Sequence, residues 1–271
     1  MKVCVIGLGE VGLATAKYVF DRGIDVWGYD TDLKAVERAK KVGILKTSCV
    51  WNDVPFVDCY LICVSTGLKG DAPDLSPIFD VCEKIKGKAV LSNHPLVSIE
   101  STVMPGLSRL VFKDIFKKRV RLVHVPHRYW VEQPVKHGVK QLRVIGGIDI
   151  ESLENGLKFY KDTLNVPLHA VSSIEIAEMS KIAENAYRYV QIAFAEELKM
   201  ICEEIGLSFD EVREACNTKW NIEILEARDG ISGHCLPKDT QYLISLTSFN
   251  TLMKDALTVD KQYREWLKLK I

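Results

Sequence analysis

The chain has 271 residues, of which 47% are hydrophobic, so it can bury a sizeable core and is not a disordered protein. Its 36 Lys and Arg residues balance its 36 Asp and Glu residues, and no basic block stands out, which argues against a binding surface for nucleic acid or an anionic membrane. We therefore expect a small-molecule substrate, with neither nucleic acid nor a membrane as partner.

The amino-terminal part alternates short β-branched runs with amphipathic helical segments, which is the pattern of a mostly parallel sheet covered on both faces. The chain enters the first strand directly at MKVCVIG, and no apolar run reaches transmembrane length, so we expect a cytoplasmic protein. Strands are predicted at residues 2–6, 25–29, 58–64, 89–91, 121–125 and 142–145.

The strongest motif is a glycine-rich turn, GLGEVG, that follows the first strand and opens a helix. In this context the first glycine makes a tight turn, the second lets a pyrophosphate approach the helix amino terminus, and the third lets helix and strand pack. Asp30 ends the next strand, where a carboxylate bonds the adenosine ribose and repels the extra phosphate of NADP. The predicted NAD-binding residues here are Gly7, Gly9, Glu10, Val11, Gly12 and Asp30. The alternative is that the glycines serve only a tight turn.

Two loops with hydroxyl side chains follow later strands. Ser65 and Thr66 come after the strand at residues 58–64, and Ser101 and Thr102 precede a predicted helix. Ligands bind at the carboxyl ends of strands in an open α/β sheet, so we expect these four residues to line the cofactor site. The alternative is that they cap helices.

After about residue 172 the pattern becomes mainly helical. Residues 173–205 have helical apolar spacing, with no Pro or Gly before Gly206. We predict a Rossmann domain at residues 1–172 and a helical domain at residues 173–271, joined by this long helix. Lys181 and Asn185 share one face of the helix, where together they would stabilise a developing alkoxide; the alternative is a solvated helix surface.

The loop GISGHCLPKD delivers Cys235 to the start of a helix, with Pro237 suited to the first helical position. A helix amino terminus and the nearby Lys238 both favour a thiolate, so we predict that Cys235 is a nucleophile. Asp239 lies one turn later, in a position to orient a water or a substrate hydroxyl. The alternative is an inert, buried cysteine. The eight cysteines form no CxxC pair and no zinc spacing, so we expect neither disulfides nor a metal site.

The chain resembles UDP-glucose, GDP-mannose and UDP-N-acetylmannosamine dehydrogenases in five motifs that occur in the same order: GLGEVG, CVSTG with APDLS, ESTVMPG, AEMSKIAENAYRYVQIAFAEEL and GHCLPKD. The resemblance spans nearly the whole chain. It implies that two hydrides pass in turn from the C6 alcohol of a sugar to NAD, through a thiohemiacetal and then a thioester on a cysteine, before water releases the acid.

The resemblance also implies a role for each matching residue. Cys235 is then the nucleophile, Lys181 and Asn185 stabilise oxyanions, Asp239 assists proton transfer, and Thr102 helps to hold a water. The long helix resembles the central dimerisation domain of the family, which implies a homodimer.

Two features depart from the pattern of that family. The family has Pro-Glu where this chain reads Pro126-His127, so His127 replaces the glutamate that takes part in acid–base chemistry and thioester hydrolysis. A histidine can serve as a general base near neutral pH. The chain also stops at Ile271, whereas the family continues into a domain that holds the nucleotide half of the substrate, which leaves the choice between a sugar and a nucleotide sugar open.

Three functions from different classes follow. We favour an NAD-dependent dehydrogenase that oxidises a sugar or nucleotide sugar through Cys235. The second is a two-electron hydroxyacid dehydrogenase, since related enzymes also use a Lys and an Asn one helical turn apart. The third is a non-catalytic module for NAD binding or dimerisation, motivated by His127 and by the missing domain.

Overall fold

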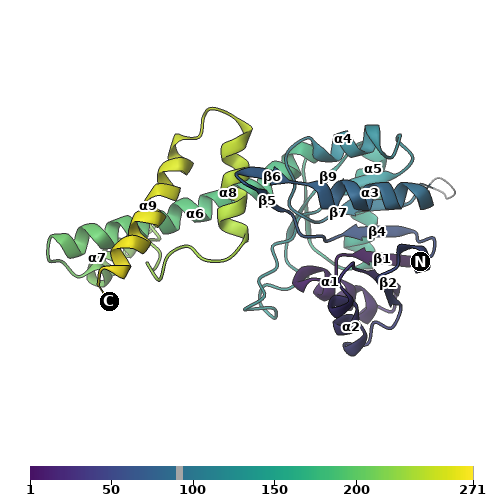
Figure 1. Ribbon diagram of the computed structural model, residues 1–271, viewed down its shortest axis with the longest axis horizontal. Helices are drawn as coiled ribbons and strands as arrows, with labels where there is room; N and C mark the ends of the chain where they lie inside the picture. The colour runs from purple at the N-terminus through teal and green to yellow at the C-terminus, as the bar shows by residue number, and fades with distance from the viewer. Residues whose placement is uncertain (90–93, 271) are drawn as a thin grey trace. The chain divides into compact units, whose positions relative to one another are not determined.

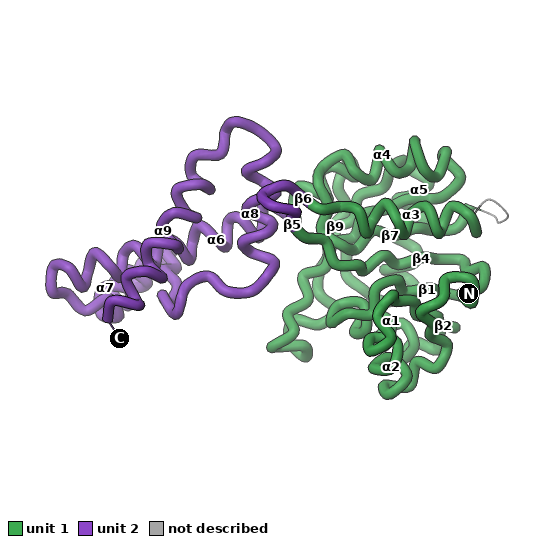
Figure 2. The backbone as a smooth tube through the Cα atoms, in the orientation of Figure 1, with its two compact units in different colours: residues 1–67, 74–181 green, residues 68–73, 182–271 purple. Residues whose placement is uncertain are grey.

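The computed structural model describes residues 1–89 and 94–270 and divides the chain into two compact units (Figure 2). Unit 1 comprises Met1–Gly67 and Asp74–Lys181, and unit 2 comprises Leu68–Pro73 and Ile182–Ile271. Among the described residues, each cluster of buried apolar side chains draws its members from one unit only. Each unit is therefore packed around its own interior.

Unit 1 is built on a sheet whose order, for the strands described, is β10-β9-β8-β7-β4-β1-β2-β3. These strands are β1 (Lys2–Ile6), β2 (Asp25–Tyr29), β3 (Thr47–Ser48), β4 (Cys59–Ile62), β7 (Leu96–Ile99), β8 (Arg121–His124), β9 (Arg143–Gly147) and β10 (Leu168–Ala170). Neighbouring strands are parallel except for β8 and β9, which are antiparallel. The predicted doubly wound, mostly parallel α/β architecture is confirmed. A separate ribbon pairs β5 (Gly67–Lys69) with β6 (Ala72–Asp74).

Helices lie on both faces of the unit 1 sheet (Figure 1). An apolar core fills the space between the helices and the sheet on each face. The helical elements are α1 (Glu10–Asp21), α2 (Leu33–Lys41), α3 (Ser76–Ala89), α4 (Leu107–Asp114), α5 (Ile150–Leu157), a 3-10 turn at Trp51–Asp53 and a π-helical turn at Lys158–Thr163. The first core joins α1, α2 and the π-helical turn to one face of the sheet, and the second joins α3 and α4 to the other. Strands β1, β4 and β7 are almost wholly buried because both of their faces are covered.

Most of the predicted strands of this sheet are present, with ends that shift by at most a few residues. The strand predicted at residues 89–91 is wrong at its first position, because Ala89 is the last residue of α3; residues 90 and 91 lie outside the described residues. The strand in this part of the chain is β7, whose short apolar run directly follows Pro95. Strands β3 and β10 were not predicted, since they are only two and three residues long and lie at the sheet edges.

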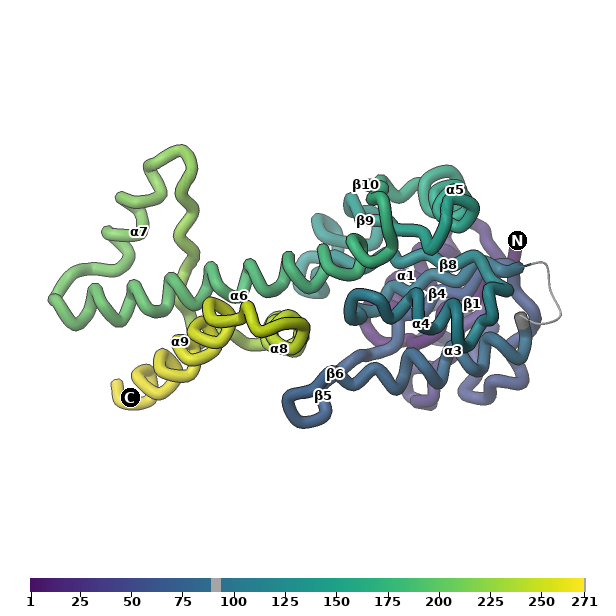
Figure 3. The backbone as a smooth tube through the Cα atoms, turned by 90° about the horizontal axis from the view of Figure 1, so that it is seen from above, coloured from purple at the N-terminus to yellow at the C-terminus, as the bar shows by residue number. Residues whose placement is uncertain are grey.

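Unit 2 is helical and is organised around α6 (Ile174–Glu204), which begins in unit 1 and runs as one continuous helix into unit 2 (Figure 3). The other helices are α7 (Phe209–Asn217), α8 (Cys235–Leu246) and α9 (Thr251–Lys268). The long helix predicted at residues 173–205 is confirmed, and Gly206 ends it with a φ of 75°, a conformation in which glycine is the favoured helix terminator. No helix among the described residues combines the length and apolar character needed to cross a membrane.

Inside unit 2, α6 carries a buried carboxyl group. The Glu196 side chain is buried, and neither of its oxygens has a hydrogen-bond partner among the described residues. Burial, together with the nearby charge of Asp260, raises the pKa of Glu196 to about 8, and Arg264 opposes this only in part. Glu196 is therefore protonated at neutral pH in the folded chain, whereas in the unfolded chain it ionises near its ordinary pKa of 4.5.

We expect Glu196→Gln to stabilise the protein at neutral pH and to have little effect near pH 4.5. Between about pH 4.5 and pH 8 the unfolded state loses the Glu196 proton and the folded state keeps it, so the wild-type free energy of unfolding falls as pH rises. At about 1.4 kcal/mol per pH unit, the variant should gain on the order of 3 kcal/mol at pH 7. Urea unfolding at both pH values measures this difference.

The neighbouring Glu197 provides a matched control because it is exposed. Glu197→Gln should change the free energy of unfolding by less than about 0.5 kcal/mol at either pH. Equal effects of the two substitutions, or a Glu196→Gln effect that does not change with pH, would contradict the assignment of a buried, protonated Glu196.

Candidate functional site

The turn between β1 and α1 needs glycine at two of its three glycine positions. Gly7 has a φ of 88°, and a Cβ atom there would lie 2.7 Å from the carbonyl oxygen of Cys63. At Gly12 a Cβ atom would lie 1.7 Å from the carbonyl oxygen of Gly7. Gly9 is the N-cap of α1. By contrast with the other two positions, a Cβ atom added at Gly9 would have no described atom within 4 Å apart from its own chain neighbours. The turn thus leaves an open approach to a helix amino terminus, which is the geometry that binds a pyrophosphate.

The predicted ribose-binding carboxylate lies beside this turn. Asp30 follows β2, and its Oδ2 accepts a hydrogen bond of 2.6 Å from the backbone amide of Leu8. Its Oδ1 accepts a second bond, of 2.9 Å, from the amide of Asp32. These two bonds fix the carboxylate next to the glycine turn. Glu10, which is exposed, and Val11, which is half-buried, form the first turn of α1.

The loops after β4 and β7 are tied together by the hydroxyl groups predicted to line the cofactor site. The buried Thr66 donates to the carbonyl oxygen of Thr102 over 2.9 Å, and the buried Ser101 donates to the carbonyl oxygen of Val64 over 2.7 Å. Ser65 is exposed and Thr102 is half-buried. Thr66 and Ser101 therefore hold the two loops in place, while the side chains of Ser65 and Thr102 remain accessible to a ligand.

A buried polar cluster lies under these loops, and His127 is part of it. His127 is 7% exposed, and its Nε2 lies 3.0 Å from Oγ1 of Thr15 in α1 and within hydrogen-bond distance of Oε2 of Glu100. Glu100, directly after β7, has a fully buried side chain. Arg143 of β9 places a guanidinium nitrogen 3.3 Å from the same Oε2. The Tyr160 hydroxyl contacts Oε1 of Glu100.

In this cluster the negative charge of Glu100 is balanced by Arg143, and His127 remains a neutral imidazole. Burial alone would raise the pKa of Glu100, but the positive charge of Arg143 and the hydrogen bonds from His127 and Tyr160 outweigh burial and hold that pKa at about 2. Burial, reinforced by the positive charge of Arg143, lowers the pKa of His127 from its ordinary value of 6.5. At neutral pH the Glu100 carboxylate is therefore paired with Arg143, and His127 is neutral.

The same cluster contains residue types that bind metals. Potential ligand atoms of Cys63, Glu100 and His127 all lie within 4.8 Å of one another. Burial keeps the pKa of Cys63 well above its usual range, so its thiol is protonated and donates to Glu100 over 3.4 Å. A divalent cation bound to a Cys63 thiolate, Glu100 and His127 would leave the buried Arg143 without a counter-charge, which is costly. We therefore assign no metal to the cluster.

The first turns of α6 contribute to unit 1. Glu178 is fully buried, and its carboxylate accepts hydrogen bonds of 2.6 Å and 2.8 Å from the amides of Gly106 and Ser108 at the start of α4. Glu178 thus caps another helix, a role that the sequence did not reveal. Lys181, one turn later, is half-buried and close enough to His127 for its charge to contribute to the lowered pKa of that histidine. Two of the predicted catalytic residues, Lys181 and His127, therefore belong to the same unit and interact through their charges.

In unit 2, α6 and α8 bring together two other predicted residues. Asn185 donates from Nδ2 to Oδ2 of Asp239 over 2.5 Å, and Asp239 is fully buried. Lys238 contacts the other oxygen of Asp239 and places its ammonium 4.3 Å from the centre of the Tyr242 ring. The lysine is thus engaged by the carboxylate, a contact not predicted from the sequence.

Cys235 is exposed and is the first residue of α8, with His234 as the N-cap. The helix begins two residues earlier than predicted, so Pro237 is its third residue. This start is still compatible with proline, since the amides of the first turn have no partner within the helix. The thiol is therefore located at a helix amino terminus, as predicted, and it is not sealed among apolar side chains.

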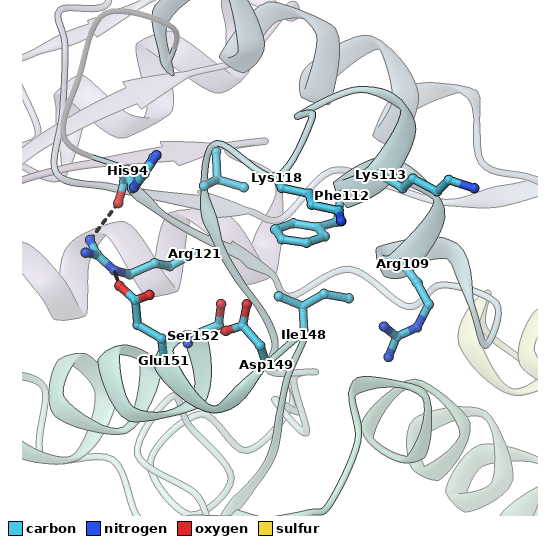
Figure 4. Close-up of a pocket in the computed structure, with 11 residues that line it drawn as sticks. His94, Arg109, Phe112, Lys113, Lys118, Arg121, Ile148, Asp149, Glu151 and Ser152 are labelled. Carbon is cyan, nitrogen blue, oxygen red and sulfur yellow. Dashed lines mark hydrogen bonds and ion pairs between the residues drawn. The ribbon is translucent and has the colours of Figure 1, made fainter.

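A cavity of about 490 Å³ in unit 1 lies away from these residues (Figure 4). Arg121, the first residue of β8, lines it and bonds Glu151 and the carbonyl oxygen of His94. Because β8 is in parallel register with β7, its first residue is at the end of the sheet opposite the glycine turn. Arg109 and Lys113 of α4 add positive charge to the rim. The cavity is not part of the candidate site.

Comparison with known proteins identifies the relatives of this chain. Residues 36–164 match the NAD binding domain of the UDP-glucose/GDP-mannose dehydrogenase family, and residues 175–261 match its central domain. A UDP-N-acetyl-D-mannosamine dehydrogenase of Methanocaldococcus jannaschii is 32% identical over 94% of this chain and 64% of its own length. The chain therefore spans about 64% of the length of this relative. The match to the NAD binding domain confirms NAD as the cofactor. The open glycine turn and the adjacent Asp30 carboxylate are suited to this cofactor.

Solved structures give the same result. The UDP-D-ManNAc dehydrogenase of Pyrococcus horikoshii matches with a TM-score of 0.87 and 29% identity, over 97% of this chain and 69% of that one. A 3-hydroxyisobutyrate dehydrogenase of Mycobacterium tuberculosis matches with a TM-score of 0.65 and 15% identity, over 96% of this chain and 85% of that one. The second similarity shows a shared fold only.

Proposed function

Because the chain belongs to the UDP-glucose/GDP-mannose dehydrogenase family, we propose that it oxidises the C6 alcohol of a sugar or nucleotide sugar to the acid, through a covalent intermediate on Cys235. The observation that carries the proposal is the arrangement of α8. An exposed thiol occupies the first residue of the helix, and one turn later Asp239 is buried and bound to Asn185 of α6. A nucleophile and a positioned acid–base group on one helix suit covalent oxidation of an aldehyde.

NAD would be held by the glycine turn and by Asp30. The amides at the start of α1 would bind the pyrophosphate, Asp30 would accept from the adenosine ribose, and Ser65 and Thr102 would contribute from the loops after β4 and β7. When bound, NAD supplies the hydride acceptor for both oxidations. The absence of a side chain at Gly9 leaves room for this approach, and the absence of one at Gly12 lets α1 pack against the turn.

The protein residues supply the remaining steps. The C6 alcohol loses a hydride and a proton to give an aldehyde, and the Cys235 sulfur adds to the aldehyde carbon. The thiohemiacetal loses a second hydride and a proton to give a thioester, and water then breaks the C–S bond to release the acid and the thiol. Lys181 and Asn185 stabilise the oxyanions, Asp239 assists proton transfer, and Thr102 helps to hold the water. His127 takes the place of the family glutamate as base.

Counting NADH per product tests the proposal. The chain would be incubated with NAD and with UDP-glucose, UDP-N-acetylmannosamine, GDP-mannose or the corresponding free sugars. Two NADH per molecule of uronic acid from one of these substrates is the expected result. One NADH with an aldehyde or ketone product would instead support the two-electron dehydrogenase that the Lys181 and Asn185 pair suggests. NAD binding without turnover on any of them would leave a non-catalytic NAD-binding module.

We also propose that α6 forms a homodimer interface. Large apolar side chains recur along the exposed side of this helix, namely Ile176, Met179, Tyr187, Phe194 and Ile201, which are 38% to 67% exposed. Tyr187, Phe194 and Ile201 follow one another at intervals of seven residues. This interval keeps side chains on one face of a helix, where they can pack against a partner helix. A second copy of this chain would cover the row.

The eight free cysteines are consistent with the reducing cytoplasm, where we place the reaction.

Phe194→Asp is expected to convert the homodimer into a monomer. A charge in the middle of the apolar row would have to be buried without a partner if the dimer formed, and that costs several kcal/mol. Sedimentation equilibrium measures the change in mass. Phe249→Asp is the matched control, because Phe249 is 94% exposed and belongs to the loop between α8 and α9 and not to α6. A monomeric wild type, or two variants that both remain dimeric, would contradict the α6 interface.

A further inference from the structure

We propose that Glu100 and His127 form a carboxylate–imidazole pair, in which Glu100 holds the imidazole proton on Nε2 and leaves Nδ1 as the base that activates water. The inference rests on the proposed function for the identity of the reaction. It adds a positioning residue, Glu100, and assigns the reacting atom of His127.

The hydrogen bonds around Nε2 decide where the proton lies. Nε2 is within hydrogen-bond distance of Oε2 of Glu100, and Oγ1 of Thr15 lies 3.0 Å away. A carboxylate only accepts hydrogen bonds, so Nε2 must carry the hydrogen that it shares with Glu100. Thr15 then accepts as a second partner of the same N–H. In the neutral imidazole this leaves Nδ1 as the nitrogen with a free lone pair.

Glu100 is itself fixed from several directions. The Tyr160 hydroxyl donates to Oε1, the Cys63 thiol donates to Oε2 over 3.4 Å, and the Arg143 guanidinium lies 3.3 Å from Oε2. Burial keeps the pKa of Tyr160 well above its usual range, so its hydroxyl remains a donor. The donors come from β9, the π-helical turn and the residue that follows β4, and they leave the carboxylate little freedom to turn away from His127.

The Nδ1 atom of His127 lacks the partner that a buried acceptor needs. It is inaccessible to solvent, and no hydrogen-bond partner lies near it among the described residues. Such an atom is costly unless a water or a ligand satisfies it. The charged groups that face His127 are Glu100, Arg143 and Lys181. Two of these are cations, which disfavour a permanent imidazolium and favour a neutral ring that takes up a proton only transiently.

The pair acts in the hydrolysis of the thioester. An O–H proton of water moves to Nδ1 of His127 as the water oxygen attacks the carbonyl carbon of the thioester. The C–S bond breaks as the tetrahedral intermediate collapses, which gives the acid and a Cys235 thiolate. The imidazolium then gives up its proton and the thiolate takes one up, so that both groups return to their starting states. The pair thereby performs the hydrolytic task of the single glutamate that the family has at this position.

The tautomer can be read directly, whatever the substrate proves to be. In the full chain labelled with 15N in its histidine rings, we expect the neutral Nε2–H form for His127, with its signals assigned by their loss in His127→Gln. Glu100→Gln should shift His127 toward the Nδ1–H form, since an amide can donate to Nε2. Tyr160→Phe is the matched control, because it removes one donor and leaves the carboxylate, so the tautomer should not change. A wild-type His127 that is Nδ1–H or imidazolium would overturn the proposal.

A kinetic measurement separates positioning from a structural role. Both hydride transfers precede hydrolysis, so Glu100→Gln should keep a burst of two NADH per chain and then release acid about a hundredfold more slowly, the scale of loss when a carboxylate that orients a catalytic histidine is neutralised. A parallel loss of burst and steady state would mean that Glu100 only maintains the fold. If wild type turns over no substrate, the proposed function fails, whereas the tautomer measurement still tests the pair.

Discussion

Cys235→Ala is expected to reduce turnover by about a thousandfold or more while leaving NAD affinity unchanged. The thiol is the proposed covalent nucleophile, and loss of a nucleophile removes the intermediate through which both the second oxidation and the hydrolysis proceed. NAD affinity should not change, because the variant keeps the glycine turn and Asp30, which we propose hold the pyrophosphate and the adenosine ribose. Steady-state NADH formation and a fluorescence titration with NADH measure the two properties.

Cys216→Ala provides the control for this substitution. Cys216 is also exposed and also lies on a helix of unit 2, so its loss matches the change in side chain without touching the proposed nucleophile. Its variant should turn over like wild type. Substantial activity in Cys235→Ala, together with one NADH per product, would support the two-electron reaction instead.

Gly12→Ala is expected to abolish NAD binding and to lower the free energy of unfolding by about 3 kcal/mol. The new Cβ atom would lie 1.7 Å from the carbonyl oxygen of Gly7 and 3.1 Å from the Cβ atom of Cys63, so α1 would have to move away from β1. That movement would displace the helix amino terminus from the turn that binds the pyrophosphate. Urea unfolding and an NADH titration measure the two effects.

Gly9→Ala separates cofactor binding from folding. Gly9 has a φ of −66°, which alanine adopts readily, and its added Cβ atom would meet no other described atom within 4 Å. The variant should fold like wild type but bind NAD at least about tenfold more weakly, because the methyl group occupies the space that the pyrophosphate needs. If Gly9→Ala bound NAD normally, the pyrophosphate could not lie at this turn.

The fold was largely predictable because its signals are local. The GLGEVG turn, the β-branched runs and the helical spacing of residues 173–205 each appear within a short stretch of sequence, and the structure has β1, α1 and α6 at these places. The prediction was wrong at Ala89, which is the last residue of a helix instead of the first residue of a strand. Short apolar runs do not distinguish these two structures by periodicity.

The polar contacts of the site were less predictable because they join distant positions. Glu100 contacts Tyr160, which is 60 residues away, and Glu178 caps a helix that begins about 70 residues earlier in the chain. No spacing rule relates such residues, and a buried glutamate is not distinguishable from an exposed one by its neighbours in sequence. By contrast, Asn185 and Asp239 were both predicted as site residues, although their mutual hydrogen bond was not.

The central claim is that the sugar becomes covalently attached to Cys235 during oxidation. Rapid acid quenching of the chain during turnover, followed by mass spectrometry of the peptide that contains Cys235, tests this most directly, and Glu100→Gln should increase the trapped fraction by slowing hydrolysis. We predict a mass increase equal to the sugar acyl group on Cys235 and on no other cysteine. Production of two NADH per acid with Cys235 unmodified at every quench time would contradict the mechanism.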